Sequence, residues 1–291
     1  MNFIKAIQSG TSITLRNYKI ILFIYLFNLV FGIIIALPFA ATVESAQGMY
    51  GAMAPLANDF DMTLFSDFMR EYGKGLGAIF NVSIWLIPVY LVLQVFLQGG
   101  ILHLFIADKQ KFNVSAFLQN GAKFFWKYLF VTLLFLVKHA IGLLIIMVPV
   151  MVNFSDGLEG VESEASYWNA AYWSIGIYMI VFTLISVAAD FSKIKMMHDE
   201  GTSFFRSILE GWKMLFSSFK ASFSIALISI VLIASMYLIY WKLSDLINPS
   251  TTITFMALLI VQQFVNMIRV AVRIIYYGSL NALLHPLETS D

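Results

Sequence analysis

The residues of this sequence best placed to do chemistry are ionisable side chains inside long apolar segments. Lys138 and His139 interrupt such a segment. Lys138 lies 11 residues after Lys127, a rise of about 16 Å along a helix. A charged lysine at that depth of a bilayer costs about 2.5–3.5 kcal/mol on insertion scales. Two interpretations remain open: a wet, positive cavity that accepts an anion such as a lipid phosphate, or a neutral lysine in a segment whose register differs.

A second polar pattern lies in the last apolar segment. Gln262, Asn266, Arg269 and Arg273 are spaced by four, three and four residues, so a helix would carry them on one face. That face is predicted to look into a helix bundle or a cavity. With Lys138 and His139 these four residues are the candidate ligand-binding set. The alternative is structural: both arginines obey the rule that basic residues stay inside, or pair with Asp190.

Three further polar residues are assigned a structural role. Gln94 and Gln98 are four positions apart and are expected to hydrogen-bond to another helix, because amide side chains hold membrane helices together. Asp190 closes an apolar segment and is the acceptor that the arginines could use.

Motifs of enzymes and cofactor-binding proteins are missing from the sequence. It has no P-loop, no GxSxG, no HExxH and no GxGxxG. Cysteine is absent, and the four histidines are far apart, which argues against a metal centre. The sequence therefore predicts a protein that is not an enzyme and has neither cofactor nor metal. No basic block indicates nucleic acid as a partner.

Composition indicates what must position these side chains. Hydrophobic residues make up 60% of the chain and charged residues 12%, with a mean hydropathy of +0.82, whereas soluble domains carry about 25% charged residues. Since a membrane helix needs about 20 apolar residues, the predicted fold is an all-α polytopic membrane helix bundle of about six transmembrane helices. The expected spans are Tyr18–Ala41, Ile79–Ala107, Phe124–Val152, Trp168–Ala189, Phe219–Trp241 and Thr252–Leu284.

The distribution of lysine and arginine predicts the orientation of these spans. With both termini in the cytoplasm, 14 of the 18 basic residues fall on inner segments, as the positive-inside rule requires. The loop 153–167 contains four acidic residues and no basic residue. The first apolar run is too long for the core of a cleavable signal peptide. We expect a multi-pass protein of the bacterial cytoplasmic (inner) membrane, with membrane lipids as partners.

A short pattern recurs before the odd-numbered spans. The segments FIKAIQSG (3–10), VSAFLQNG (114–121) and FFRSILEG (204–211) each place a large apolar residue seven positions before a glycine. Each is followed by basic residues and then by a span. We interpret them as interfacial amphipathic helices that open three copies of one unit, 1–107, 108–189 and 190–291. Each unit would consist of an amphipathic helix, an outward span, a loop and a return span. Pro88 and the pair Gly99-Gly100 predict a kink or a close helix contact in the second span.

This plan, the glycine-terminated segments and the stretch from Asp190 to Gly211 carry a resemblance to a known group. The chain resembles six-span bacterial proteins related to the membrane domain attached to some glycerophosphodiester phosphodiesterases. It departs from them in lacking the soluble hydrolase domain and its catalytic carboxylates. The resemblance therefore implies a stand-alone membrane module without the hydrolase activity.

Two functional hypotheses follow from the sequence. The first is a non-enzymatic inner-membrane subunit or scaffold that binds lipid or a membrane-protein partner. The alternative is a transporter or channel-like carrier of an anionic solute or lipid, which would use the positive and amide side chains inside the spans. An intramembrane enzyme ranks third because no nucleophile with a positioned base can be identified.

Overall fold

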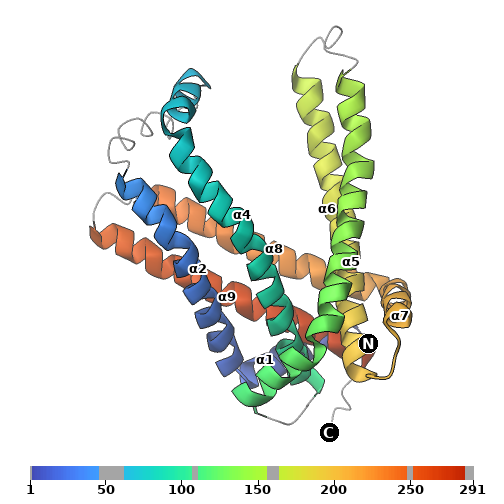
Figure 1. Ribbon diagram of the computed structural model, residues 1–291. Coiled ribbons are helices and arrows are strands. Elements are labelled where there is room, and N and C mark those ends of the chain that lie inside the picture. Colours follow the sequence, from blue (N-terminus) through green and yellow to red (C-terminus); the bar gives the residue numbers. More distant parts are fainter. Residues whose placement is uncertain (1, 46–61, 107–110, 156–163, 248–251, 286–291) are drawn as a thin grey trace. The chain divides into compact units, whose positions relative to one another are not determined.

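The computed structural model describes residues 2–45, 62–106, 111–155, 164–247 and 252–285, and every regular element in these ranges is a helix (Figure 1). Together with the apolar composition, this confirms the all-α polytopic class. The helices are α1 (Phe3–Arg16), α2 (Lys19–Ser45), α4 (Met62–Ile106), α5 (Val114–Ser155), α6 (Glu164–His198), α7 (Phe204–Ser217), α8 (Phe219–Ile247) and α9 (Thr252–Leu284).

Five of the described helices are long and apolar enough to cross a membrane. A sixth candidate span is the pair formed by α1 and the start of α2, which is bent by 77° at the break between them. This agrees with the prediction of about six spans. The sequence placed the end of the fourth span at Ala189, but α6 continues to His198, so Lys193 lies inside the helix and not on a loop.

The chain divides into two compact units. The smaller is Phe23–Gln94, in which the side chain of Asn28 joins α2 to α4. Its Oδ1 accepts hydrogen bonds from Nε2 of Gln94 at 2.8 Å and from the hydroxyl of Tyr90 at 3.3 Å. The Tyr90 ring also packs against Phe31, with centroids 5.1 Å apart.

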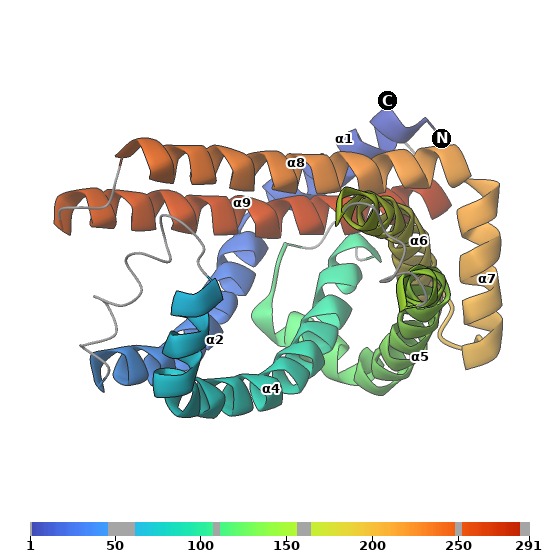
Figure 2. The same cartoon turned by 90° about the horizontal axis from the view of Figure 1, so that it is seen from above.

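The larger unit is Met1–Leu22 together with Val95–Asp291. Two helical hairpins form most of it: α5 lies beside α6, and α8 lies beside α9 in both views (Figures 1 and 2). The short helix α1 packs on α9, and α7 packs on α6. These short helices contact α6 and α9 near their C-terminal ends. We call this end of the larger unit the inner edge, because the predicted topology places it at the cytoplasm.

The helices α1 and α7 include two of the three recurring segments, 3–10 and 204–211. Each buries one narrow stripe, which in α1 contains Ala6, Gly10 and Ile13 and in α7 contains Ile208, Gly211 and Leu215. These spacings of three and four residues place one helical face against the neighbouring span. The remaining predicted segment, 114–121, is not a separate helix. It forms the first turns of α5, which curves near its start in Figure 1.

The glycines that end the three recurring segments, Gly10, Gly121 and Gly211, each lie against the backbone of another helix. We call them the repeat glycines. A Cβ at Gly10 would lie 2.7 Å from the carbonyl oxygen of Ile275 on α9. A Cβ at Gly121 would lie 2.9 Å from that of Phe96 on α4, and one at Gly211 would lie 2.6 Å from that of Ala188 on α6. Only a residue without a side chain allows such close approach.

The glycine pair predicted to make a close helix contact also does so. The added Cβ of Gly99 would lie 3.1 Å from the Cα of Gly121. The added Cβ of Gly278 on α9 would lie 2.9 Å from the Cα of Gly10. Two of the three contacts are therefore glycine against glycine, which brings the helix axes as close as backbones permit.

We predict that Gly211→Ala lowers the free energy of unfolding by about 1–3 kcal/mol, the usual cost of overpacking. The new methyl group would meet backbone atoms of Ala188 and Ser192, which cannot rotate away. Thermal unfolding of the purified protein in detergent measures this change.

The matched control is Gly176→Ala in α6, where an added Cβ meets no atom within 4 Å. Alanine is favoured over glycine in a helix by about 1 kcal/mol, so this variant should unfold at the same temperature or higher. Equal destabilisation of both variants would contradict the close contact at Gly211.

Candidate functional site

A buried set of polar side chains lies just inside the positions where the repeat glycines dock. The repeat glycines contact the backbone at Phe96, Ala188 and Ile275. Two residues after these positions come Gln98 on α4, Asp190 on α6 and Tyr277 on α9. These three side chains meet. The Nε2 group of Gln98 donates to Oδ1 of Asp190 at 3.0 Å and to the hydroxyl oxygen of Tyr277 at 2.9 Å.

Two further residues complete the set. Lys193 donates from Nζ to Oε1 of Gln98 at 2.7 Å, and the hydroxyl of Tyr276 donates to Oδ2 of Asp190 at 3.0 Å. Lys193 is 6% exposed. We call these five residues, Gln98, Asp190, Lys193, Tyr276 and Tyr277, the central polar network.

The network meets the demands that a low-dielectric interior makes on polar groups. An unpaired buried charge costs several kcal/mol, whereas a hydrogen-bonded one costs much less. Gln98 can serve both charges because its amide has a donor and an acceptor. Its NH₂ group faces the carboxylate of Asp190 and its carbonyl faces the ammonium group of Lys193. Gln98 is therefore the residue on which the network depends.

The candidate ligand-binding residues of α9 are divided among different neighbours. Arg273 is exposed and donates from Nη2 to the hydroxyl of Tyr277 at 3.5 Å. Its charge also acts on Asp190. Arg269 instead donates to the hydroxyl of Tyr237 on α8 at 3.1 Å.

The other two residues of that stripe lie nearer the start of α9. Asn266 accepts a hydrogen bond from the same Tyr237 hydroxyl at 3.4 Å, so it shares a partner with Arg269. Gln262 is exposed. Of the four, Arg273 is the one that reaches the central polar network.

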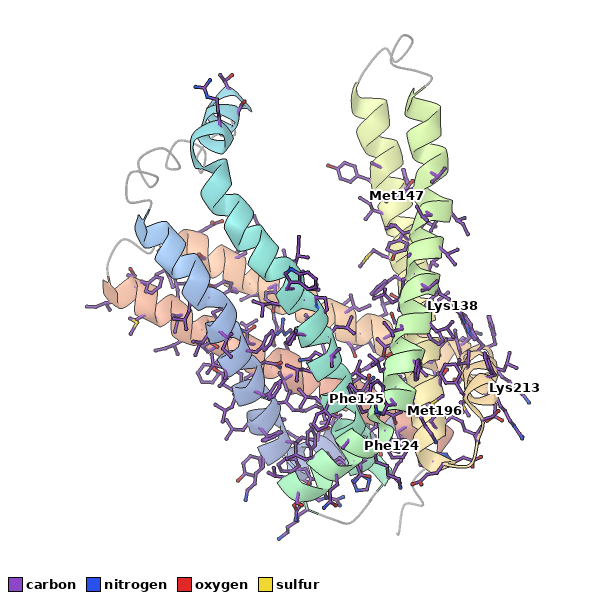
Figure 3. The ribbon with its side chains drawn as sticks, viewed as in Figure 1. Phe124, Phe125, Lys138, Met147, Met196 and Lys213 are labelled. Atoms are coloured by element: carbon purple, nitrogen blue, oxygen red, sulfur yellow. The ribbon has the colours of Figure 1, made fainter. Side chains whose placement is uncertain are left out.

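Lys138 and His139 do not form one site, because they face different helices. The Nζ atom of Lys138 lies 4.5 Å from the ring centroid of Phe135 and 5.4 Å from that of Trp212 on α7. These are cation–π distances. His139 faces α6: its Nε2 lies 3.4 Å from Oγ of Ser186, and its ring lies 4.4 Å from that of Phe182. Figure 3 shows Lys138 midway along α5.

The inner edge carries a separate set of charged residues and two histidines. Lys195 lies 3.3 Å from Glu210 of α7, and Lys123 lies 2.6 Å from Glu200. His198 pairs with Oδ1 of Asn281 at 2.7 Å, and its ring stacks on His285 with centroids 3.8 Å apart. The polar cluster around His198 thus joins the end of α6 to the end of α9. Among the described residues, no group of three His, Asp or Glu side chains could hold a metal ion.

Sequence reasoning named two members of the central polar network, Gln98 and Asp190, and missed Lys193, Tyr276 and Tyr277. Lys193 was missed because α6 was expected to end earlier. Tyr276 and Tyr277 were missed because they carry no charge, and the search for polar sites within the spans considered charged and amide side chains. Only the structure puts Gln98, Asp190 and Tyr277 in register, because it shows which backbone positions the repeat glycines contact.

The helical architecture and the apolar spans define a multi-pass α-helical membrane protein, of which five to six helices are candidates to cross the bilayer. No protein-family model, no curated protein and no solved structure matches the chain. Its function must therefore be argued from its own residues.

We predict that Gln98→Leu lowers the free energy of unfolding by about 3–5 kcal/mol. The substitution leaves the buried Lys193 without its acceptor and removes a donor from Asp190, and breaking a buried charged contact on one side has this cost. Thermal or denaturant unfolding in detergent provides the measurement.

Gln262→Leu is the control, because Gln262 is an exposed glutamine inside a span. Substitutions at exposed positions usually change stability by less than about 0.5 kcal/mol. If both glutamine variants behave alike, the network does not stabilise the fold.

The stacked histidines predict a pH dependence of stability. Burial, the neighbouring His198 and then Lys195 hold the pKa of His285 below its usual 6.5. The unfolded chain then binds this proton more readily than the folded chain, so stability is complete above about pH 6.5 and falls as the pH drops below it.

The measurement is the unfolding temperature between pH 8 and pH 5, for the native chain and for His285→Gln. The variant should lose less stability over this range than the native chain. An identical loss in both would show that His285 does not contribute.

Proposed function

We propose that this chain is a non-enzymatic, multi-pass protein of the bacterial cytoplasmic membrane that acts as a subunit or scaffold and binds anionic lipids at its inner edge. The observation that supports this most directly is the outward face of α7. That helix is packed on α6 along one side, yet its other side is also apolar.

Three large apolar side chains project from α7: Phe205 is 75% exposed, Leu209 70% and Phe216 67%. Their spacings of four and seven residues put them on one stripe. The opposite stripe is buried on α6. A water-facing helix would carry polar residues at the exposed positions, so the outward stripe suits the boundary between headgroups and acyl chains.

The charges on α7 suit an anionic surface. Its one acid, Glu210, lies 2.9 Å from Arg206 and 3.3 Å from Lys195, so its charge is neutralised within the protein. Lys213 is exposed, and in Figure 3 it projects from α7 away from the adjoining helices. Lys220 follows at the start of α8 and is also exposed. Each basic residue near an anionic membrane contributes about 1 kcal/mol of attraction.

The position of Lys138 fits the same arrangement. Its ammonium group lies over the ring of Trp212, which belongs to α7. If α7 lies in the headgroup layer, Lys138 reaches that layer too, and the cost of a charge at the bilayer centre does not arise. The supporting contact is a cation–π pair, which is worth about 0.5–2 kcal/mol.

We also propose that the frame is built from three related copies, as the recurring segments suggest. In each copy a repeat glycine docks on the return helix of another copy: α1 on α9, the start of α5 on α4, and α7 on α6. The second copy therefore docks on the first, the third docks on the second, and the first docks on the third. The resemblance to stand-alone membrane modules agrees with a scaffold of this kind.

The depth of α7 can be tested with single cysteines, since the native chain has none. A fluorophore attached at position 209 or 216 in proteoliposomes should be quenched by lipids that carry a quencher near the headgroup. The same fluorophore at position 213 should be quenched more by an aqueous quencher. Aqueous quenching at all three positions would contradict membrane contact of α7.

Lipid binding itself is tested by native mass spectrometry of the protein released from mild detergent. We expect bound anionic phospholipid, and about tenfold less of it when Arg206, Lys213 and Lys220 are all changed to glutamine. A reproducible protein partner on an otherwise lipid-free chain would overturn the lipid assignment.

A further inference from the structure

We propose that the junction of α5 and α7 binds one phospholipid, with its phosphate group on the ammonium group of Lys138 and an acyl chain along α5. This proposal rests on the proposed function, which places α7 at the membrane surface. It goes further by assigning one lipid molecule to one charged group. The partners of Lys138, the aromatic rings that hold it and the apolar stripe beyond it support the site.

The ammonium group of Lys138 has no anionic partner in the described part of the chain. Its Nζ atom lies over two aromatic rings, those of Phe135 and Trp212. No carboxylate or hydrogen-bond acceptor of the described residues contacts it, and burial is the effect that acts on its charge. An ammonium group has three N–H donors, and aromatic rings supply no oxygen to accept them. The oxygens of a phosphate group would satisfy both the donors and the charge.

The charges near Lys138 on α7 favour an anion. The one acid of α7 is Glu210, which lies 2.9 Å from Arg206 and 3.3 Å from Lys195, so its charge is already neutralised. Lys213, next to Trp212 in the sequence, is exposed and adds a positive charge to the same helix. A negatively charged ligand is therefore attracted to this junction and meets no carboxylate of α7 that would repel it.

The aromatic rings hold the ammonium group in one position. The rings of Phe135 and Trp212 are nearly parallel, at 20° with centroids 6.3 Å apart. The Nζ atom of Lys138 lies 4.5 Å and 5.4 Å from these centroids. Because one ring belongs to α5 and the other to α7, the lysine is fixed where the two helices meet. A side chain that is already ordered loses less conformational freedom on binding, so the site is formed before the lipid arrives.

An apolar stripe leads from Lys138 toward the far end of α5. Ile141 and Ile145 follow three and seven residues later, so they lie on the same helical face as Lys138. They are 51% and 67% exposed, and they lie about 4.5 Å and about 10 Å further along the helix axis. On α7, the exposed Phe216 stacks on Trp212. A cation followed by exposed apolar side chains matches the phosphate and acyl chain of a phospholipid, whereas a free phosphate would use only the cation.

The length of α5 permits this placement. Its 42 residues rise about 63 Å, whereas the hydrocarbon core of a bilayer is about 30 Å thick. Lys138 lies 17 residues before Ser155, where α5 ends, a rise of about 26 Å. With Lys138 at the inner headgroups, the remainder of α5 crosses the core, and Ile141 and Ile145 face acyl chains. Trp212 then lies at the membrane interface, where tryptophan is enriched.

The test uses the purified full-length chain in detergent and measures ligand-induced shifts of the unfolding temperature together with native mass spectra. The probes are dioctanoyl phosphatidic acid, dioctanoylglycerol, which lacks the phosphate, and glycerol phosphate, which lacks the acyl chains. We expect one tightly bound phosphatidic acid for each chain, and stabilisation by this probe alone. Equal stabilisation by glycerol phosphate would assign a free phosphate, and equal stabilisation by dioctanoylglycerol would show that the phosphate is not recognised. Either result would overturn the site.

Two lysine variants locate the site. Lys138→Gln should weaken the binding of phosphatidic acid about tenfold or more, as expected for the loss of a charge-assisted donor. Lys242→Gln is the matched control, because Nζ of Lys242 also lies over a tryptophan ring, 4.4 Å from the centroid of Trp241. Lys242 is near the end of α8 that points away from the inner edge, so its charge is screened from the site and the variant should change binding less than about twofold. Equal weakening in both variants would reveal a diffuse charge effect and overturn the site.

Lys138→Arg guards against loss of binding through misfolding. It keeps the positive charge and the N–H donors that suit a phosphate, so binding should stay within about threefold of the native chain. Loss of binding in this variant as well, or unchanged binding in Lys138→Gln, would overturn the site. The fluorophores on α7 report separately on the proposed function. Membrane contact of α7 with unchanged binding in Lys138→Gln would overturn this site alone, whereas aqueous quenching at every labelled position would overturn the membrane contact on which it rests.

Discussion

The close approach of helix backbones at Gly10, Gly121 and Gly211 is the constraint on which the larger unit depends. Membrane helices gain little from hydrophobic association, because lipid tails are as apolar as the side chains they would bury. Packing must then come from short backbone distances and from hydrogen bonds. At the inner edge the chain obtains the first by omitting side chains at three docking points. Substitutions that restore a side chain there push helices apart and do not merely fill space.

The central polar network complements these contacts. The repeat glycines join α5 to α4, α7 to α6 and α1 to α9, whereas the network joins α4, α6 and α9 to one another. Gln98, Asp190 and Tyr277 then share hydrogen bonds that would be out of reach in a looser bundle. Polar contacts of this kind require specific geometry, so they favour one arrangement of the helices over others that apolar packing alone would permit.

The sequence was sufficient for the features that depend on length and periodicity. Apolar runs predicted the spans, the recurring glycine-terminated segments predicted helices where α1 and α7 lie, and the pair Gly99-Gly100 predicted a close helix contact. The sequence was insufficient where a helix extends beyond the end of its apolar run. The fourth span was expected to end at Ala189, but α6 continues to His198, and in this extension Lys193 donates to Gln98 and Lys195 pairs with Glu210. Those partners are distant in the sequence, so no local pattern could indicate them.

The stripe on α9 illustrates a second limit. Its spacing predicted one helical face directed into a bundle or cavity, but it could not show that Asn266 and Arg269 share Tyr237 of α8 as a partner. Likewise, adjacency in the sequence suggested that Lys138 and His139 act together. Consecutive residues on a helix point about 100° apart, and here they contact different helices.

The location of the glycine contacts has a mechanical consequence. In the larger unit the hairpins α5/α6 and α8/α9 are long, and the short helices and repeat glycines hold them at one end. Each hairpin can therefore rotate about the contacts at the inner edge. A slight rotation at these contacts would therefore become a much larger displacement at the far tip of each hairpin.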